Sequence, residues 1–181
     1  MNEEHWREFY SKPHLELACP SPFALWASQF LRNRRIVDLG CGTGRDTRYF
    51  RQQNCSTYGV DRFAPQQAGF FQMDFEDYLR ADPEVEVVWC RFIFHAIEIK
   101  MQKKILAWAS RWGATMYIEA RSNLDKPKPG HKRRLIDGQA LVSEMISDGF
   151  RLFHYEEGYG RAKFGSEDPH VFRIVAKGQG K

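Results

Sequence analysis

Three glycines at alternate positions, framed by carboxylates, form the stretch of this chain whose residue types and spacing best predict chemistry. They are Gly40, Gly42 and Gly44, with Asp38 before them and Asp46 after them. The apolar run 36–39 predicts a buried strand, and residues 45–53 can continue as a helix. A strand, a tight glycine turn and a helix build a ligand-binding crevice at the carboxyl end of a sheet strand. A plain tight turn is the alternative interpretation.

The glycine spacing separates several kinds of nucleotide site. A dinucleotide-binding turn needs a third small residue where this chain has Arg45. The phosphate-cradling pattern that ends in Gly-Lys-Ser/Thr is also absent from the sequence. Asp38 at the strand end would repel a pyrophosphate but suits a cationic ligand. The stretch could therefore serve a cationic ligand rather than a pyrophosphate.

Two more acids follow predicted strands. Asp61 ends the run 56–61, 21 positions after Gly40, where an acidic residue commonly binds ribose hydroxyls. Asp74 ends the run 70–74 and precedes Phe75. These two residues could border an adenine, although Asp74 could equally cap a helix over 75–79.

A polar cluster follows the fourth and fifth predicted strands, 85–92 and 114–121. The fourth delivers Arg91 and then His95, and the fifth delivers Arg121. Carboxyl ends of parallel strands meet at one edge of a sheet, so these groups are expected to face the same crevice. His95 is a candidate general base, and a hydrogen-bonded structural histidine is the alternative.

Basic residues gather in two later loops. The formal net charge is only +4, but 121–134 carries seven basic or histidine side chains against Asp125: Arg121, Lys126, Lys128, His131, Lys132, Arg133 and Arg134. Tyr159 and Arg161 lie in the second loop, 157–164. Such a local excess favours an anionic partner, whereas a solvated loop is the alternative.

Length and composition bound the class of protein. At 181 residues, 43% hydrophobic and 28% charged, the chain is expected to form one soluble domain. It has no apolar run of about 20 residues and no secretory signal pattern. Its four cysteines are scattered, and its six histidines show no ligand spacing, so neither disulfides nor a metal are expected. A cytoplasmic location is the simplest expectation.

The order of elements predicts an α/β fold. Seven candidate strands alternate with helices, and the last two, 150–155 and 170–176, are expected to form an antiparallel hairpin. Residues 1–34 are expected to form an N-terminal helical lid, with a helix over 2–10 and another beginning at Ser21-Pro22. Residues 35–181 then form a Rossmann-like, doubly wound, mostly parallel sheet.

The stretch 38–44 resembles motif I of the class I S-adenosylmethionine (SAM) dependent methyltransferases, whose sheet has seven strands with the last inserted antiparallel. The resemblance covers about residues 35–178 and implies SAM as the cofactor, with S-adenosylhomocysteine as the product. It implies that eleven residues contact the cofactor: Tyr10, Asp38, Gly40, Gly42, Gly44, Asp46, Asp61, Arg62, Asp74, Phe75 and Arg91.

Short motifs resemble a narrower branch, the small methyltransferases of bacterial O-antigen and capsular polysaccharide clusters. They are Gly44-Arg45-Asp46, Arg91-Phe92-x-x-His95-Ala96, residues 119–122, residues 130–134 and Glu167-Asp168-Pro169. Some such relatives methylate a phosphate that caps a glycan. His95 and Arg91 are the predicted catalytic residues, and Arg121, His131, Arg133, Arg134, Tyr159 and Arg161 are the predicted acceptor-binding residues, since cationic side chains could cradle an oxyanion.

The acceptor decides how much chemistry the enzyme must supply. A phosphate monoester, with a second pKa of about 6, is already an oxyanion at neutral pH and needs cationic positioning. An uncharged hydroxyl needs a base such as His95, and an uncharged hydroxyl or amine of a small molecule is the alternative substrate. A nucleic-acid substrate is not expected, because binding it would require a broader basic face. A non-catalytic SAM-binding module is a further alternative.

Overall fold

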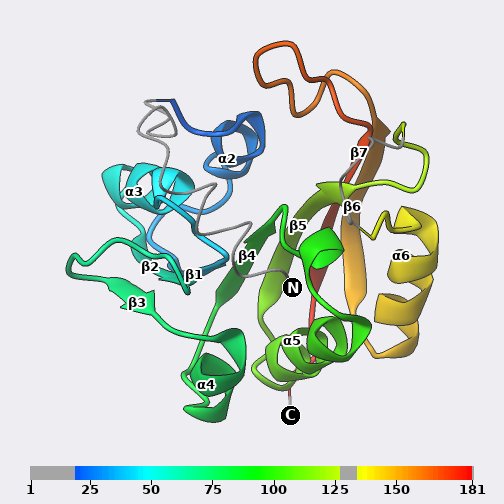
Figure 1. Ribbon diagram of the computed structural model, residues 1–181. Helices are drawn as coiled ribbons and strands as arrows, with labels where there is room; N and C mark the ends of the chain where they lie inside the picture. Colours follow the sequence, from blue (N-terminus) through cyan, green and yellow to red (C-terminus); the bar gives the residue numbers. More distant parts are fainter. Residues whose placement is uncertain (1–18, 127–133, 181) are drawn as a thin grey trace.

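The computed structural model describes residues 19–126 and 134–180, which form a seven-stranded sheet with helices on both faces (Figure 1). The expected helix over 2–10, which includes Tyr10, lies outside the described residues, and so do His131 and Arg133. The strands are β1 (Arg35–Leu39), β2 (Ser56–Asp61), β3 (Phe70–Gln72), β4 (Val87–Arg91), β5 (Thr115–Arg121), β6 (Arg151–Gly158) and β7 (Val171–Lys177). The helices are α2 (Pro22–Ala27), α3 (Arg45–Gln52), α4 (Phe75–Arg80), the 3₁₀ helix η2 (Phe94–Ala96), α5 (Ile99–Arg111) and α6 (Gly138–Ser147).

The strand order confirms the predicted topology. It runs β3-β2-β1-β4-β5-β7-β6, with β1 to β5 parallel and β7 antiparallel between β5 and β6. The order reverses between β1 and β4, the place where open α/β sheets bind ligands. The predicted crevice therefore lies at the carboxyl ends of β1 and β4.

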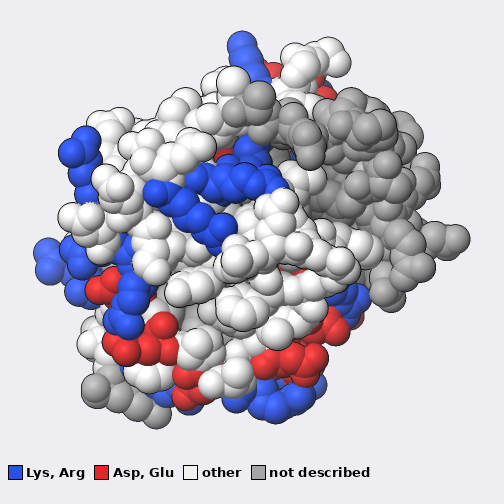
Figure 2. Space-filling model, turned by 90° about the vertical axis from the view of Figure 1, so that its left-hand side faces the viewer, with Lys and Arg blue, Asp and Glu red and all other residues white. Residues whose placement is uncertain are grey.

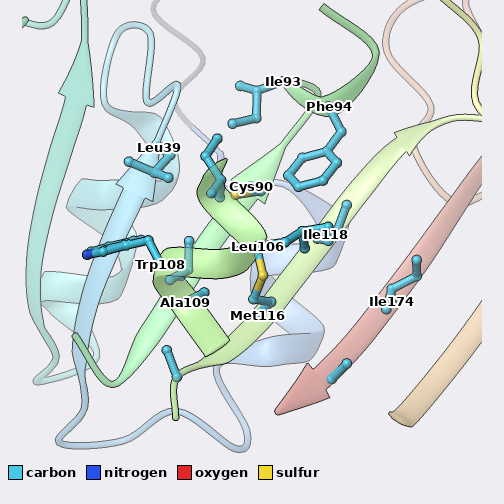
Figure 3. Close-up of a cluster of buried hydrophobic side chains, with 14 of the residues drawn as sticks. Leu39, Cys90, Ile93, Phe94, Leu106, Trp108, Ala109, Met116, Ile118 and Ile174 are labelled. Carbon is cyan, nitrogen blue, oxygen red and sulfur yellow. The ribbon is translucent and has the colours of Figure 1, made fainter. Parts of the chain in front are cut away.

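The larger core lies between the sheet and the helices α4, α5 and α6, which cover one of its faces. Apolar side chains of α5 recur at helical spacing and meet those of β1, β4, β5 and β7 (Figure 3). Leu106 and Ala109 of α5 contribute to it, as do Leu39, Met116 and Ile174 from the strands. This packing holds the strands whose carboxyl ends carry the polar residues against α5.

A second core covers the opposite face beneath α2 and α3. Phe23 of α2 is fully buried and stacks on Trp89 of β4 at 4.6 Å between ring centroids. The helix starts at Ser21 and Pro22 as expected, but it ends at Ala27, because residues 28–31 form i to i+3 turn bonds. Its role as part of a lid over residues 1–34 stays a prediction.

None of the helices of the described residues is long and apolar enough to cross a membrane. In the part of the chain that the structure describes, no cluster of three or more His, Cys, Asp or Glu side chains is arranged to hold a metal.

Candidate active site

A cavity of about 800 Å³ opens along the carboxyl ends of β1, β2, β4 and β5. Most of the predicted site residues line it, from elements far apart in sequence: Asp38, Gly40, Gly42, Asp46, Asp61, Arg62, Asp74, Phe75, Arg91, His95 and Arg121. Two sides can be distinguished. The glycine-turn side is lined by residues from the segments 38–46, 61–63 and 73–75, and the β5 side is lined by Arg121 and by residues from the segments 91–95 and 162–169.

The glycine turn needs glycine for both conformation and space. Gly40 has φ +79°, and a Cβ there would lie 1.9 Å from Cγ2 of Ile93. Gly44 has φ +80° where α3 begins, and a Cβ there would meet the ring of Phe70 at 2.4 Å. Only a residue without a side chain fits these close approaches. Gly44 thus shapes the turn although it does not itself line the cavity.

Asp61 closes the turn by hydrogen bonds to backbone amides. The Gly42 amide donates to its Oδ2 at 3.1 Å, and the Phe63 amide donates to its Oδ1 at 2.8 Å. Burial nevertheless raises the pKa of Asp61 above its ordinary value. Each carboxylate oxygen has a second lone pair, so Asp61 can still accept from ligand hydroxyls.

Asp38 is a buried carboxylate that favours a cationic ligand. Burial and the nearby charge of Asp46 raise its pKa to about 7, while the Thr47 hydroxyl donates to its Oδ2 at 2.6 Å and opposes the rise. Sequence reasoning missed Thr47, which helical spacing from Phe50 on α3 could have placed toward the sheet. A positive group beside Asp38 would stabilise its charged form.

Asp46 has a structural connection that the sequence did not predict. The Ser21 amide and hydroxyl donate to its two oxygens at 2.9 and 2.7 Å, and Arg45 Nε lies 2.9 Å from Oδ1. Burial acts to raise its pKa, but the charges of Arg45 and Arg91 and these hydrogen bonds lower it overall. Asp46 therefore joins the start of α2 to the first turn of α3.

Asp74 does not cap α4 with its side chain, although it occupies the N-cap position. Its carboxylate instead pairs with Arg62 at the cavity wall. The capping alternative is therefore corrected, because the nearby guanidinium is a stronger partner for a carboxylate than a neutral amide. Phe75 follows and lines the same wall.

On the β5 side, a network of ion pairs joins four strands, β4, β5, β7 and β6. Glu119 of β5 is fully buried, and its two oxygens lie 2.8 Å from Nε of Arg91 and 2.7 Å from Nε of Arg173. Arg173 of β7 also pairs with Glu156 of β6 at 2.9 Å. Burial without partners would be costly for each charge, so the network stabilises every member.

Arg121 is equally engaged. Its guanidinium pairs with Asp125 at 2.9 Å and with Glu167 at 2.7 Å. Arg91 lies over the ring of Phe92, 4.3 Å from its centroid, and Phe92 has φ +61°. A bulky residue in that conformation marks a strained turn, and such turns occur often at functional sites.

His95 lies between these groups on η2. It is 4% exposed, and the Arg121 amide donates to its Nδ1 at 3.2 Å. The Arg134 amide donates to the backbone carbonyl oxygen of His95 at 3.2 Å, but Arg134, a predicted acceptor-binding residue, does not line the cavity.

Two predicted acceptor-binding residues lie elsewhere. Tyr159 packs edge-on against His170, and Arg161 pairs with Glu156 at 2.6 Å, so neither side chain lines the cavity. The same connection between β6 and β7 brings Lys163 and Phe164 to the lining, and the sequence analysis did not select them. The excess of basic residues in this loop was the available signal, but it could not distinguish neighbours in the loop.

Charges of both signs are mixed on the face that α3, β2 and β3 occupy in Figure 1. Figure 2 shows acidic side chains beside basic ones along the lower part of this face. Among the exposed pairs of the described residues, Arg80 pairs with Asp77 and Lys104 pairs with Glu76.

Comparisons with known proteins agree with this geometry. Residues 4–126 match the family described as "Methyltransferase domain", whereas no curated protein matches the sequence. The 1,6-didemethyltoxoflavin-N1-methyltransferase of Burkholderia thailandensis, with bound 1,6-didemethyltoxoflavin and S-adenosylhomocysteine, is 15% identical at TM-score 0.69, covering 96% of this chain and 87% of that one. A SAM-dependent methyltransferase from Archaeoglobus fulgidus is 17% identical at TM-score 0.67, covering 84% and 90%. Magnesium protoporphyrin IX methyltransferase from Synechocystis PCC 6803, with bound SAM, is 15% identical at TM-score 0.61, covering 86% and 76%.

The family match covers more than half of the chain, so the chain belongs to the methyltransferase domain family. By family and fold it is a class I methyltransferase, an enzyme whose cofactor is S-adenosylmethionine.

Proposed function

We propose that this enzyme transfers the methyl group of SAM to a small anionic acceptor, with a phosphate monoester such as a glycan phosphate as the substrate class. The observation that carries the proposal is that Arg91, Arg121 and Lys163 line one side of the cavity whose other side is the glycine turn. Methyl transfer from a sulfonium is an in-line displacement, so it mainly requires that donor and acceptor are held in line.

The glycine-turn side suits the charge of SAM. Asp38 would lie near the positively charged part of the cofactor, and Asp61 would accept from the ribose hydroxyls. Met73 and Phe75 supply apolar surface for the adenine, next to the Arg62–Asp74 pair. These assignments rest on the lining of the cavity and on the resemblance of the turn to motif I.

Among the described residues that line the β5 side, Lys163 is the cation best able to serve an incoming anion. Its nearest carboxylate, Asp168, lies 4.0 Å away, whereas Arg91 and Arg121 pair with carboxylates at 2.9 Å or less. The lysine ammonium can therefore turn to a phosphate at small cost. Arg91 and Arg121 would then orient the phosphate from a fixed position.

The polysaccharide part of the proposal rests on the short motifs. Residues of four of them, Asp46, Arg91, Arg121 and Glu167, line the one cavity, although they are far apart in sequence. Three of these residues, Arg91, Arg121 and Glu167, lie on the β5 side, and this supports a shared role of those motifs in handling the acceptor.

An uncharged hydroxyl or amine is the second candidate acceptor. It is favoured by the ion pairs that already neutralise Arg91 and Arg121, since a paired guanidinium gains less from a further anion. A hydroxyl acceptor would need His95 as its base.

Acceptor panels with labelled SAM distinguish the two. We expect sugar phosphates to be methylated in preference to the same sugars without phosphate. We expect Lys163→Ala to raise the acceptor KM by about 10-fold, the effect of losing one charge-assisted contact at a partly exposed site. Lys103→Ala is the matched control, because Lys103 is a similarly exposed lysine on α5 that does not line the cavity. Preferential methylation of unphosphorylated sugars, or an unchanged KM in Lys163→Ala, would contradict the proposal.

A further inference from the structure

The hydrogen bond to His95 Nδ1 determines what this side chain can do. Strands β4 and β5 pair as far as Arg91 and Glu119, and the chain then leaves the sheet at Phe92. The amide of Arg121 lies two residues further along β5, beyond the last paired residues of β4. His95 Nδ1 lies 3.2 Å from that amide and accepts from it. The imidazole thus takes the place of a strand carbonyl.

A backbone amide can only donate a hydrogen bond, so the nitrogen that faces it must carry a lone pair. A neutral imidazole has one proton, and that proton must then lie on the other nitrogen, Nε2. The opposite arrangement would place two donors 3.2 Å apart. It would also leave a buried amide without its acceptor, which costs about 1–3 kcal/mol.

We infer that His95 carries its proton on Nε2 and acts as a hydrogen-bond donor rather than as the general base of the methyl transfer. This inference deepens the proposed function and rests on it for the identity of the acceptor. To act as a base through Nε2, His95 would need a lone pair on that nitrogen and its proton on Nδ1, which is the tautomer that the Arg121 amide disfavours. The carboxylates nearby are committed as well, with Glu119 between Arg91 and Arg173 and Glu167 on Arg121.

The inference restricts the substrate class to acceptors whose nucleophilic atom needs no proton removed. A phosphate monoester dianion satisfies this, because its oxyanion is present at neutral pH. A lone pair on that oxygen forms the new O–C bond, and the C–S bond breaks with its electron pair moving to sulfur. The sulfonium becomes a neutral thioether, the product is a phosphate diester, and no proton is transferred. The remaining phosphate oxygens can accept from His95 Nε2–H.

The tautomer can be measured without knowing the acceptor. Long-range ¹H–¹⁵N correlation spectra of ¹⁵N-labelled protein bound to S-adenosylhomocysteine at pH 8 report which imidazole nitrogen is protonated, and His95→Asn assigns the signal. We expect a protonated Nε2 and an unprotonated Nδ1 for His95. A protonated Nδ1 would overturn the inference, whatever the acceptor proves to be.

Two variants separate donor from base. The Oδ1 of His95→Asn can replace Nδ1 as the acceptor for the Arg121 amide, and the amide of His95→Gln can replace the Nε2–H donor. Neither can act as a base. With the best acceptor of the panel, we expect kcat within about 10-fold of wild type for His95→Asn and closer for His95→Gln, since only a hydrogen bond is lost. A loss of about 100-fold or more in both would show base catalysis and overturn the inference.

The pH profile gives a third readout that a merely structural role would not produce. We expect the acid limb of kcat/KM to move with the pKa of the acceptor, between a phosphate and a carboxylate acceptor, and to persist in His95→Gln. An acid limb that stays fixed for both acceptors and disappears in His95→Gln would overturn the inference. If only unphosphorylated acceptors react while Nε2 is protonated, the proposed function fails and the tautomer stands.

Discussion

The two sides of the cavity are stabilised by different kinds of interaction. On the glycine-turn side, backbone amides and glycine conformations make the shape, as in the bond from the Gly42 amide to Asp61. On the β5 side, the buried carboxylate of Glu119 pairs with Arg91 and Arg173, which lie 28 and 54 positions away in the sequence. The first side depends on local sequence, and the second depends on the sheet being assembled.

This difference has consequences for function. The glycine-turn side has little freedom to vary, because a Cβ at Gly40 would overlap Ile93. The β5 side holds charged groups whose partners could be exchanged in pairs. We therefore expect recognition of the cofactor to be the more sensitive to single substitutions in the turn, and choice of acceptor to be set on the β5 side.

The largest expected effect is that of Gly40→Ala. The new Cβ would lie 1.9 Å from Cγ2 of Ile93, so the turn must shift and SAM binding should be lost. Gly160→Ala is the matched control, because Gly160 has the same φ of +79° and nothing within 4 Å of a Cβ. The control should lose only the conformational cost, about 1–2 kcal/mol of unfolding free energy, and should bind SAM normally. Calorimetric titration with SAM and denaturant unfolding measure both, and equal losses in the two variants would contradict the steric argument.

The next largest effect tests the β5 side. Glu119→Gln leaves Arg91 and Arg173 without their shared carboxylate in a buried position, so unfolding free energy should fall by about 3–5 kcal/mol. Asp77→Asn removes the partner of Arg80 in an exposed pair and should cost about 1 kcal/mol or less. Denaturant unfolding of the two variants compares them directly. A similar small loss in both would show that the buried network does not stabilise the β5 side.

The smallest effect concerns Asp38 and its dependence on pH. The pKa of Asp38 is about 7 in the folded protein, above its usual value of 3.8. The contribution of this group to the free energy of unfolding is therefore fully present below about pH 4 and is lost as the pH rises through 7. Thr47→Val removes the hydroxyl that favours the charged form. We expect a loss of about 1.5–3 kcal/mol at pH 8 and a smaller loss at pH 5, where Asp38 is protonated.

Thr57→Val is the control for that prediction. Thr57 is also buried, and its hydroxyl has no hydrogen-bond partner among the described residues. Its replacement should leave stability nearly unchanged at both values of pH. Denaturant unfolding at pH 5 and pH 8 provides the comparison. Equal losses for Thr47→Val at the two pH values would contradict a charged Asp38 at pH 8.

Much of the fold was predictable because its signals are local. The apolar run before Gly40, the helical spacing on α5 and the Ser21-Pro22 start each depend on residues within one element. The seven-stranded sheet with an inserted antiparallel strand followed from the order of these elements and from the resemblance. The apolar residues Phe23, Trp26, Ala27, Phe30 and Leu31 recur at helical spacing, yet α2 ends at Ala27, because helical spacing alone does not show where turn bonds replace helix bonds.

The sequence by itself determined the class of this protein. A strand, the glycine turn and the acids Asp38 and Asp61 lie close enough in the chain for their spacing to specify a cofactor site. Only the tertiary structure decided how the β5 side is arranged: Glu119 holds two arginines, Lys163 rather than Arg161 lines the cavity, and the Arg121 amide donates to His95. The physical reason is that a partner for a buried charge or amide is chosen by proximity in space, and residues from β4, β5 and β7 become neighbours only when the sheet forms.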